Sequence, residues 1–159
     1  MVDVVNNELR DIPDHIHLIL PKEKINTYDI LDITDLGLVY TTTVGLEMAM
    51  RGIPVVVAGE THYRNRGFTY DPDTWDSYFS TLNALLEDLE KAWLSQDQIE
   101  LAWRYAYLFF FEFPKPFPWH LLDLRQDIKS RPVGFVLGPE GQKRYSRTFD
   151  YLTGTPVEW

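Results

Sequence analysis

Residues 39–59, VYTTTVGLEMAMRGIPVVVAG, decide the fold. Three threonines at 41–43 follow a short apolar run, and Gly52 separates an apolar segment from a second apolar run at 53–59. A glycine just past a helical segment is a helix stop signal. The pattern predicts a strand at 36–40, a helix that ends at Gly52, and a strand at 53–59. Apolar runs without alternation are typical of parallel strands that are covered on both faces.

The sequence before this stretch continues the same alternation. HIHLILP at 15–21 predicts a short buried strand that ends at a proline, and 26–35 predicts a helix capped by Asn26 or Thr27. Strands that alternate with helices across tight loops indicate a βαβαβ unit with a parallel sheet. The fold class we expect is therefore α/β, a Rossmann-like three-layer domain with a short parallel sheet.

The pattern changes after Gly59. Residues 60–74 form a loop of a length that is usually functional or disordered in a compact domain. Two amphipathic helices are then expected, the first capped by Asp73 or Thr74 and the second by Ser95. A proline-rich stretch ends the second helix. A short helix near 119–129 and a terminal helix that ends at Gly154 complete the prediction.

These observations predict a domain organisation in three parts. We expect a loose segment at 1–14, a Rossmann-like domain at 15–113, and a helical or irregular extension at 114–159. The second long helix also carries an aromatic stripe, which we expect in the core or at a domain interface: Trp103, Tyr107, Phe110 and Phe111.

Composition excludes several classes of function. The net charge is −9, so a nucleic-acid partner is not expected, because phosphate binding needs a basic face. The chain has no cysteine, which excludes disulfides and cysteine metal sites. The spacing of the four histidines does not suggest a metal site, so none is expected. No apolar run has the length of a membrane span, and we expect a cytoplasmic protein, either free or peripheral at the inner face of the membrane.

The threonine turn at 41–43 suits phosphate. It lies where a strand enters a helix, and the first turn of a helix offers unpaired N–H groups and a partial positive charge. Thr41, Thr42 and Thr43 add hydroxyl donors, and Gly45 lets a ligand approach the backbone closely. The simpler alternative is that the threonines cap the helix, with Thr43 at the capping position.

Glu47 is a lone carboxylate on an otherwise apolar helix. A buried carboxylate needs hydrogen-bond donors, and the two hydroxyls of a ribose would supply them. The alternative is an ion pair with Arg51 at i+4, or with Arg64 or Arg66 in the long loop. His62 in that loop has the alternative of an ordinary surface histidine.

Residues 35–72 resemble the donor-binding segment of the capsule polysaccharide biosynthesis family, which are GT-B glycosyltransferases and include bacterial transferases of the acidic sugar Kdo. The aromatic segment RYAYLFFFEFPKPFPW at 104–119 is similar to the aromatic helix that follows the core in that family. The matching positions are Asp35, Thr42, Thr43, Gly45, Glu47, Gly52, Pro54, Val55, Gly59, Tyr63 and Gly67.

The resemblance implies the C-terminal, nucleotide-sugar-binding half of a GT-B enzyme. The threonine turn would then hold the donor phosphates, Glu47 the ribose, and the loop with Glu60, His62 and Tyr63 would line the cleft. The donor would be a CMP- or UDP-linked sugar, and no cofactor is implied, since these enzymes hold phosphate with helix dipoles and side chains. The chain would serve capsule or surface polysaccharide biosynthesis.

Two departures from the family limit this interpretation. No His-Pro pair occurs in the 159 residues, and the chain has no room for the first GT-B domain, which normally carries the catalytic base. We therefore expect a half that is inactive alone and is completed by an N-terminal GT-B domain or a second copy. The alternatives are a non-catalytic scaffold or interaction module derived from this fold and, third, a fragment similar to UDP-sugar 2-epimerases. The sequence leaves the sugar, the acceptor, the linkage and the catalytic residues unassigned.

Overall fold

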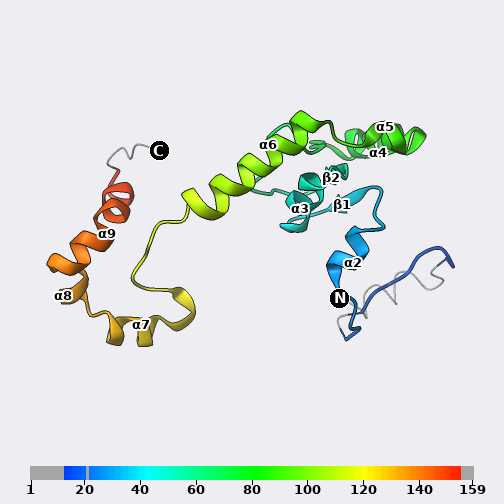
Figure 1. Ribbon diagram of the computed structural model, residues 1–159. Helices are drawn as coiled ribbons and strands as arrows, with labels where there is room; N and C mark the ends of the chain where they lie inside the picture. The colour runs from blue at the N-terminus through cyan, green and yellow to red at the C-terminus, as the bar shows by residue number, and fades with distance from the viewer. Residues whose placement is uncertain (1–12, 21, 155–159) are drawn as a thin grey trace.

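A computed structural model describes residues 13–20 and 22–154. The centre of the molecule is a short α/β unit (Figure 1) that runs α2 (Thr27–Leu31), β1 (Gly37–Val39), α3 (Val44–Met50) and β2 (Val55–Val57). The two strands are parallel, with Gly37 opposite Val55 and Val39 opposite Val57. The predicted strands at 36–40 and 53–59 and the helix between them are confirmed, although each element is shorter than expected.

A single residue of the long loop extends the sheet. Tyr70 forms a parallel bridge with Val56. Its N–H donates to the Val55 carbonyl at 2.8 Å, and its carbonyl accepts from the Val57 N–H at 2.9 Å. Because successive residues of a strand present their N–H groups to opposite sides, β2 lies between β1 and Tyr70.

The sequence predicts a strand at 15–21, but residues 15–20 form none, so this prediction is wrong there. Pro21 and residues 1–12 lie outside the described residues. The segment is extended, and its apolar side chains Ile16, Leu18, Ile19 and Leu20 are 37–47% exposed. An apolar run becomes a strand only where a neighbouring backbone pairs with it. Here the Leu20 N–H donates instead to Glu23 Oε1 at 2.9 Å, in a local turn.

The helix α3 is held by burial and by its C-terminal turn. Its residues Gly45, Leu46, Met48 and Ala49 are buried, as the apolar sequence predicted. Gly52 has a φ of +85°, its N–H donates to the Ala49 carbonyl, and the Ile53 N–H donates to the Met48 carbonyl. This Schellman arrangement requires a left-handed residue and directs the chain straight into β2.

Three further helices follow the long loop: α4 (Trp75–Glu87), α5 (Leu89–Ala92) and α6 (Gln96–Tyr107). Thr74 and Ser95 cap α4 and α6 with capping boxes, and Asn26 caps α2, as predicted. Helix α6 packs on α3, where Trp103 Nε1 donates to the Met50 carbonyl at 2.9 Å.

A π-helical turn, η1 (Leu108–Glu112), continues α6. Tyr107 Oη donates to Glu112 Oε1 at 2.9 Å, and Lys115 Nζ donates to the Glu112 carbonyl at 3.0 Å, so Glu112 joins the end of α6 to the start of the next segment. The aromatic stripe is not in the core, since Trp103, Tyr107, Phe110 and Phe111 are 50–74% exposed.

The remaining helices are η2 (Leu121–Asp123), α7 (Leu124–Ser130), α8 (Val133–Val136) and α9 (Pro139–Leu152). They lie apart from the sheet, beyond the proline-rich stretch (Figure 1). Hydrogen bonds to the proline-rich stretch hold these helices: Arg131 Nε donates to the Pro118 carbonyl at 2.5 Å, and Thr148 Oγ1 donates to the Pro116 carbonyl at 2.8 Å. Hydrogen bonds from the backbone and ring of His120, which precedes η2, lower the pKa of Asp127 in α7.

The guanidinium of Arg64 organises the long loop. Its side chain is 7% exposed. Nη1 donates to the carbonyls of Val57 and Gly59 at 3.1 and 3.2 Å. Nη2 donates to the carbonyls of Asp71 and Pro72 and to Asp73 Oδ1, at 3.2, 2.5 and 3.1 Å. One side chain therefore joins the start of the loop, at the end of β2, to its end, at the start of α4.

We expect Arg64→Gln to destabilise the fold by about 2–4 kcal/mol, because several buried carbonyls lose a charged donor. The control is Arg104→Gln on α6, whose side chain is 78% exposed. Urea unfolding followed by circular dichroism measures both variants. Equal stabilities of the two variants would contradict the role of Arg64.

Candidate functional site

The threonine turn lies at the carboxyl end of β1 and is exposed at Thr41, Thr42 and Thr43. Thr43 occupies the position before α3, but its side chain makes no capping bond. Thr42 Oγ1 instead accepts from the Val44 N–H at 3.3 Å. The expected cap at Thr43 is therefore wrong, because Thr43 has helical backbone angles that turn its hydroxyl away from the first-turn amides.

Tyr63 lies beneath this turn and joins it to the long loop. Its side chain is fully buried, and its hydroxyl donates to the Thr42 carbonyl at 2.6 Å. Burial raises the pKa of this phenol. A Cβ on Gly45 would lie 2.3 Å from the Tyr63 hydroxyl oxygen. Gly45 thus makes room for Tyr63 rather than for a ligand, and Tyr63 supports the turn from the core instead of lining a cleft.

Glu47 is partly buried and faces α2. Its carboxylate lies near the Tyr28 hydroxyl and raises the pKa of Tyr28. The alternative of an ion pair with Arg51 is wrong: Arg51 pairs with Asp32 at 2.5 Å, and its guanidinium lies 5.7 Å from the centre of the Tyr28 ring. Arg64 bonds within the loop and Arg66 lies over the Tyr105 ring of α6, so neither pairs with Glu47, whose neighbour is the Tyr28 hydroxyl.

Glu60 and His62 are both exposed on the loop that follows β2. The imidazole of His62 stacks on Phe109, with ring centres 3.8 Å apart and planes at 4°. Tyr105 Oη donates to the His62 carbonyl at 2.5 Å and lies 3.0 Å from His62 Nδ1. The Tyr105 hydroxyl has one proton and donates it to the His62 carbonyl. In the bond between the hydroxyl oxygen and the imidazole, Nδ1 is therefore the protonated donor, which leaves Nε2 as the acceptor nitrogen of the ring. Desolvation lowers the pKa of His62.

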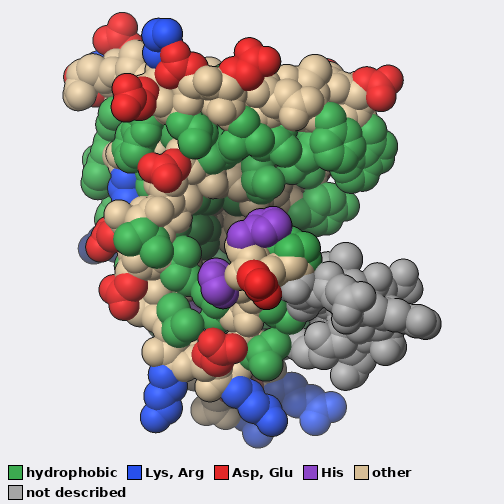
Figure 2. Space-filling model, turned by 90° about the vertical axis from the view of Figure 1, so that its right-hand side faces the viewer, with side chains coloured by type: hydrophobic (Ala, Val, Ile, Leu, Met, Phe, Trp, Pro, Cys, Tyr) green, Lys and Arg blue, Asp and Glu red, His purple; other side chains and the backbone are tan. Residues whose placement is uncertain are grey.

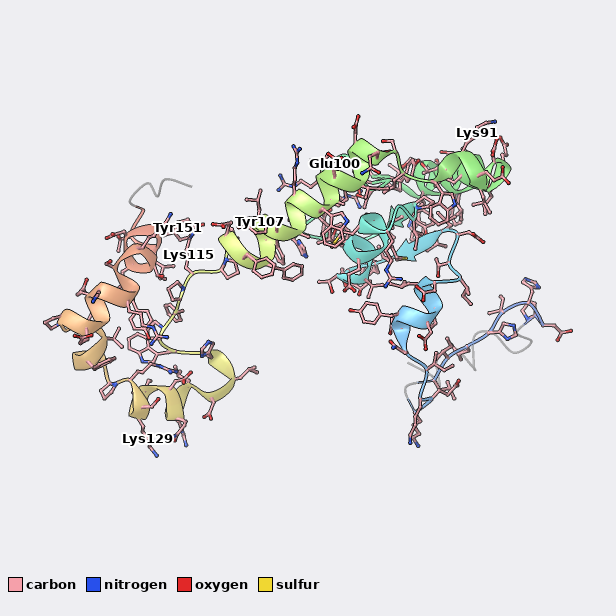
Figure 3. The ribbon with its side chains drawn as sticks, in the orientation of Figure 1. Lys91, Glu100, Tyr107, Lys115, Lys129 and Tyr151 are labelled. Carbon is pink, nitrogen blue, oxygen red and sulfur yellow. The ribbon has the colours of Figure 1, made fainter. Side chains whose placement is uncertain are left out.

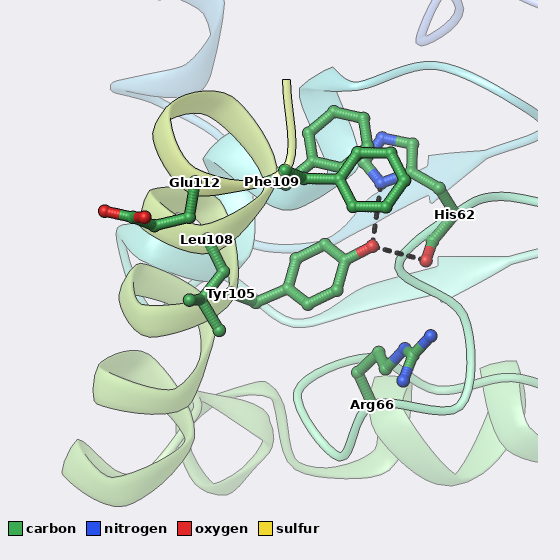
Figure 4. A pocket seen from close by; sticks show the side chains of 7 residues that line it. His62, Arg66, Tyr105, Leu108, Phe109 and Glu112 are labelled. Carbon is green, nitrogen blue, oxygen red and sulfur yellow. Dashed lines mark hydrogen bonds between the residues drawn. The ribbon is translucent and has the colours of Figure 1, made fainter. Parts of the chain in front are cut away.

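A pocket of about 610 Å³ opens beside His62 (Figure 4). The sequence interpretation missed it, although Tyr105, Phe109 and Phe113 repeat at the i, i+4 spacing of one helix face and could have indicated it. Aromatic and apolar side chains dominate its walls. The lining residues are His62, Arg66, Tyr105, Leu108, Phe109, Glu112 and Phe113.

A second hollow, of about 300 Å³, lies at the carboxyl ends of both strands. Tyr40 follows β1 and Ala58 follows β2, while Asp73 and Trp75 flank the start of α4. Tyr40 is 71% exposed and Trp75 is 72% exposed. The lining residues are Tyr40, Ala58, Pro72, Asp73, Thr74, Trp75 and Tyr78. This crevice adjoins the threonine turn through Tyr40, and the sequence interpretation did not identify it.

The structure thus links some of the predicted site residues and separates others. Thr42, Tyr63 and His62 form a contiguous set, since the rings of His62 and Tyr63 lie 5.1 Å apart, edge to face. Glu47 faces α2 and lines neither of the two hollows. Among the described residues, no group of three or more His, Asp or Glu side chains could hold a metal ion.

Comparison with protein-family models, with curated proteins and with solved structures found no match to this chain. In the part of the chain that the structure describes, no helix has the length and apolar character needed to cross a membrane.

The two threonines provide a test of the turn. Thr42→Val removes the acceptor for the Val44 N–H, so we expect a loss of about 1 kcal/mol of stability. Thr43→Val is the matched control and should change stability by less than about 0.5 kcal/mol, because its hydroxyl makes no capping bond. Thermal and urea unfolding measure both. A larger loss for Thr43→Val would contradict the assigned cap.

His62 predicts a pH dependence of stability. The pKa of His62 is lower in the folded chain than in the unfolded chain. As the pH falls below about 6.5, the unfolded chain therefore takes up a proton at His62 more readily than the folded chain, and the free energy of unfolding decreases. His62→Gln should therefore lose less stability than the wild-type chain between about pH 7.5 and 5.5. Urea unfolding at several pH values measures the two slopes. Parallel slopes would contradict a lowered pKa.

Proposed function

We propose that this chain is the nucleotide-sugar-binding domain of a glycosyltransferase of surface polysaccharide biosynthesis. The observation that carries the proposal is the crevice at the carboxyl ends of β1 and β2, next to the exposed threonine turn. Ligands of parallel α/β sheets bind in such crevices. The resemblance of residues 35–72 to capsule polysaccharide transferases supports a nucleotide sugar as the ligand.

The residues of the turn have the chemistry that this ligand needs. The hydroxyls of Thr41, Thr42 and Thr43 are exposed and can donate to phosphate oxygens. Tyr40 and Trp75 offer exposed aromatic faces to a planar base or a sugar ring. The ring of Tyr40 lies against Gly59, where a Cβ would come within 2.9 Å of it.

By the resemblance, Glu47 is the proposed ribose ligand, at a position outside the crevice, on the side of α3 that faces α2. Its carboxylate already lies near one hydroxyl, that of Tyr28, and a ribose hydroxyl is a donor of the same kind. A carboxylate has about four acceptor positions, so a ribose can share Glu47 with Tyr28 or replace it. Tyr28 is 51% exposed, which allows such a replacement. In this proposal the donor is CMP- or UDP-linked, and turnover requires an N-terminal GT-B domain or a second copy.

A second candidate function is a non-catalytic interaction module. It is favoured by exposed aromatic side chains, among them Trp75, Phe79 and Phe111, which are 72%, 54% and 74% exposed. Figure 2 shows hydrophobic side chains over much of the face on which α4 and α5 lie. Contiguous apolar surface of this kind is typical of protein contacts.

Calorimetric titration with CMP, UDP and GDP tests the proposal. We expect the wild-type chain to bind one of them selectively, and Glu47→Gln to weaken that affinity at least tenfold, which corresponds to about 1.4 kcal/mol. The matched control is Glu100→Gln, because Glu100 projects from α6 away from the body (Figure 3) and should leave affinity unchanged.

Two results would contradict this proposal. A folded wild-type chain that binds none of the three nucleotides would favour the interaction module. Nucleotide binding that Glu47→Gln and Glu100→Gln leave equally intact would exclude the ribose role of Glu47.

A further inference from the structure

The aromatic pocket beside His62 shares no lining residue with the crevice at the strand ends. Its walls come from two parts of the chain: Tyr105, Phe109 and Phe113 lie on α6 and the segment that follows it, and His62 and Arg66 lie in the long loop (Figure 4). Its volume of about 610 Å³ is in the range of small-molecule sites.

The rings of this pocket are nearly parallel. His62 and Phe109 are stacked at 3.8 Å with planes at 4°. Tyr105 and Phe109 have planes at 11° with centres 6.1 Å apart, and Phe109 and Phe113 have planes at 10° with centres 6.4 Å apart. Parallel rings favour a flat guest that lies in the same orientation, since offset stacking adds about 0.5–1.5 kcal/mol per pair to the burial of area. A flexible aliphatic chain gains nothing from this alignment.

The turn η1 explains the alignment. A π-helical turn adds a residue to the helical repeat and is frequent at functional sites. It places Phe109 over the imidazole of His62, while Tyr105, one turn earlier, reaches the backbone of the same histidine. The loop and the helix therefore fix the rings from both sides.

Charge in the pocket comes from Arg66. Its guanidinium lies 5.6 Å from the centre of the Tyr105 ring. No ion pair joins Arg66 to a carboxylate of the described residues. The carboxylate of Glu112 also lines the pocket and accepts from the hydroxyl of Tyr107. Arg66 and Glu112 therefore give the pocket one charged group of each sign, and an anionic group is favoured on the Arg66 side only.

We propose that this pocket binds a planar aromatic molecule that carries one anionic group, such as an aromatic carboxylate. The ring stacks parallel to Phe109, and the anionic group pairs with Arg66. This binding goes beyond the proposed nucleotide-sugar site and does not depend on it.

The test uses 2-naphthoate as the probe, with its own fluorescence as the readout. Two matched ligands separate the contributions: 2-naphthalenemethanol keeps the ring and lacks the charge, and decanoate keeps the charge and lacks the ring. We expect 2-naphthoate to bind at least tenfold more tightly than either, with the affinities of the two matched ligands measured by calorimetry.

Three variants locate the binding. Arg66→Gln should weaken 2-naphthoate at least tenfold and leave 2-naphthalenemethanol unchanged. Phe109→Leu, which keeps an apolar side chain, should weaken both aromatic ligands. The control Arg104→Gln lies on α6 outside this pocket and should change neither. Circular dichroism verifies the fold of each variant. Arg66 is exposed, so Arg66→Gln should fold and can test the proposal even if Phe109→Leu unfolds.

Decanoate that binds as tightly as 2-naphthoate would overturn the proposal, as would 2-naphthoate binding that Arg66→Gln leaves unchanged or that is absent. Glu47→Gln should bind 2-naphthoate like the wild-type chain. A failure of nucleotide binding with 2-naphthoate binding intact would therefore reject the proposed function and leave this site standing.

Discussion

The buried guanidinium of Arg64 is the contact on which the arrangement of the candidate site depends. By donating to carbonyls on both arms of the loop, it holds the segment between β2 and α4 in one conformation. Its neighbour Tyr63 then lies fixed beneath the threonine turn and bonds to Thr42. His62, the next residue back, is placed against Phe109. The loop thereby connects two hollows: the crevice at the strand ends and the aromatic pocket on α6.

Much of the fold could be predicted because its signals are local. Glycine at position 52 ends α3 in a left-handed turn, and polar side chains cap α2, α4 and α6, so the sequence itself carries these boundaries. The apolar runs at 36–40 and 53–59 pair with each other across one short helix, a contact that the βαβ pattern predicts. The helix caps that were predicted are Asn26, Thr74 and Ser95.

The features that escaped prediction depend on partners distant in sequence. The run at 15–20 has the composition of a strand, but no neighbouring backbone pairs with it. Gly45 suggested an approach path for a ligand because nothing in the sequence shows that the Tyr63 hydroxyl fills this space. Arg64 bonds mainly to backbone carbonyls. Every residue has a carbonyl, so the sequence does not show which ones Arg64 contacts. Glu47 had plausible arginine partners nearby, and the structure gave it the hydroxyl of Tyr28 instead.

The most direct test of the central claim is hydrogen exchange at the Tyr70 amide. If Arg64 holds the loop against the sheet, this N–H remains bonded to the Val55 carbonyl, and it should exchange as slowly as the Val57 amide, which donates to Tyr70 in return. Both amides should lose their protection together in Arg64→Gln. Rapid exchange at Tyr70 in the wild-type chain, with Ala58 still protected by its bond to Val39, would contradict the account.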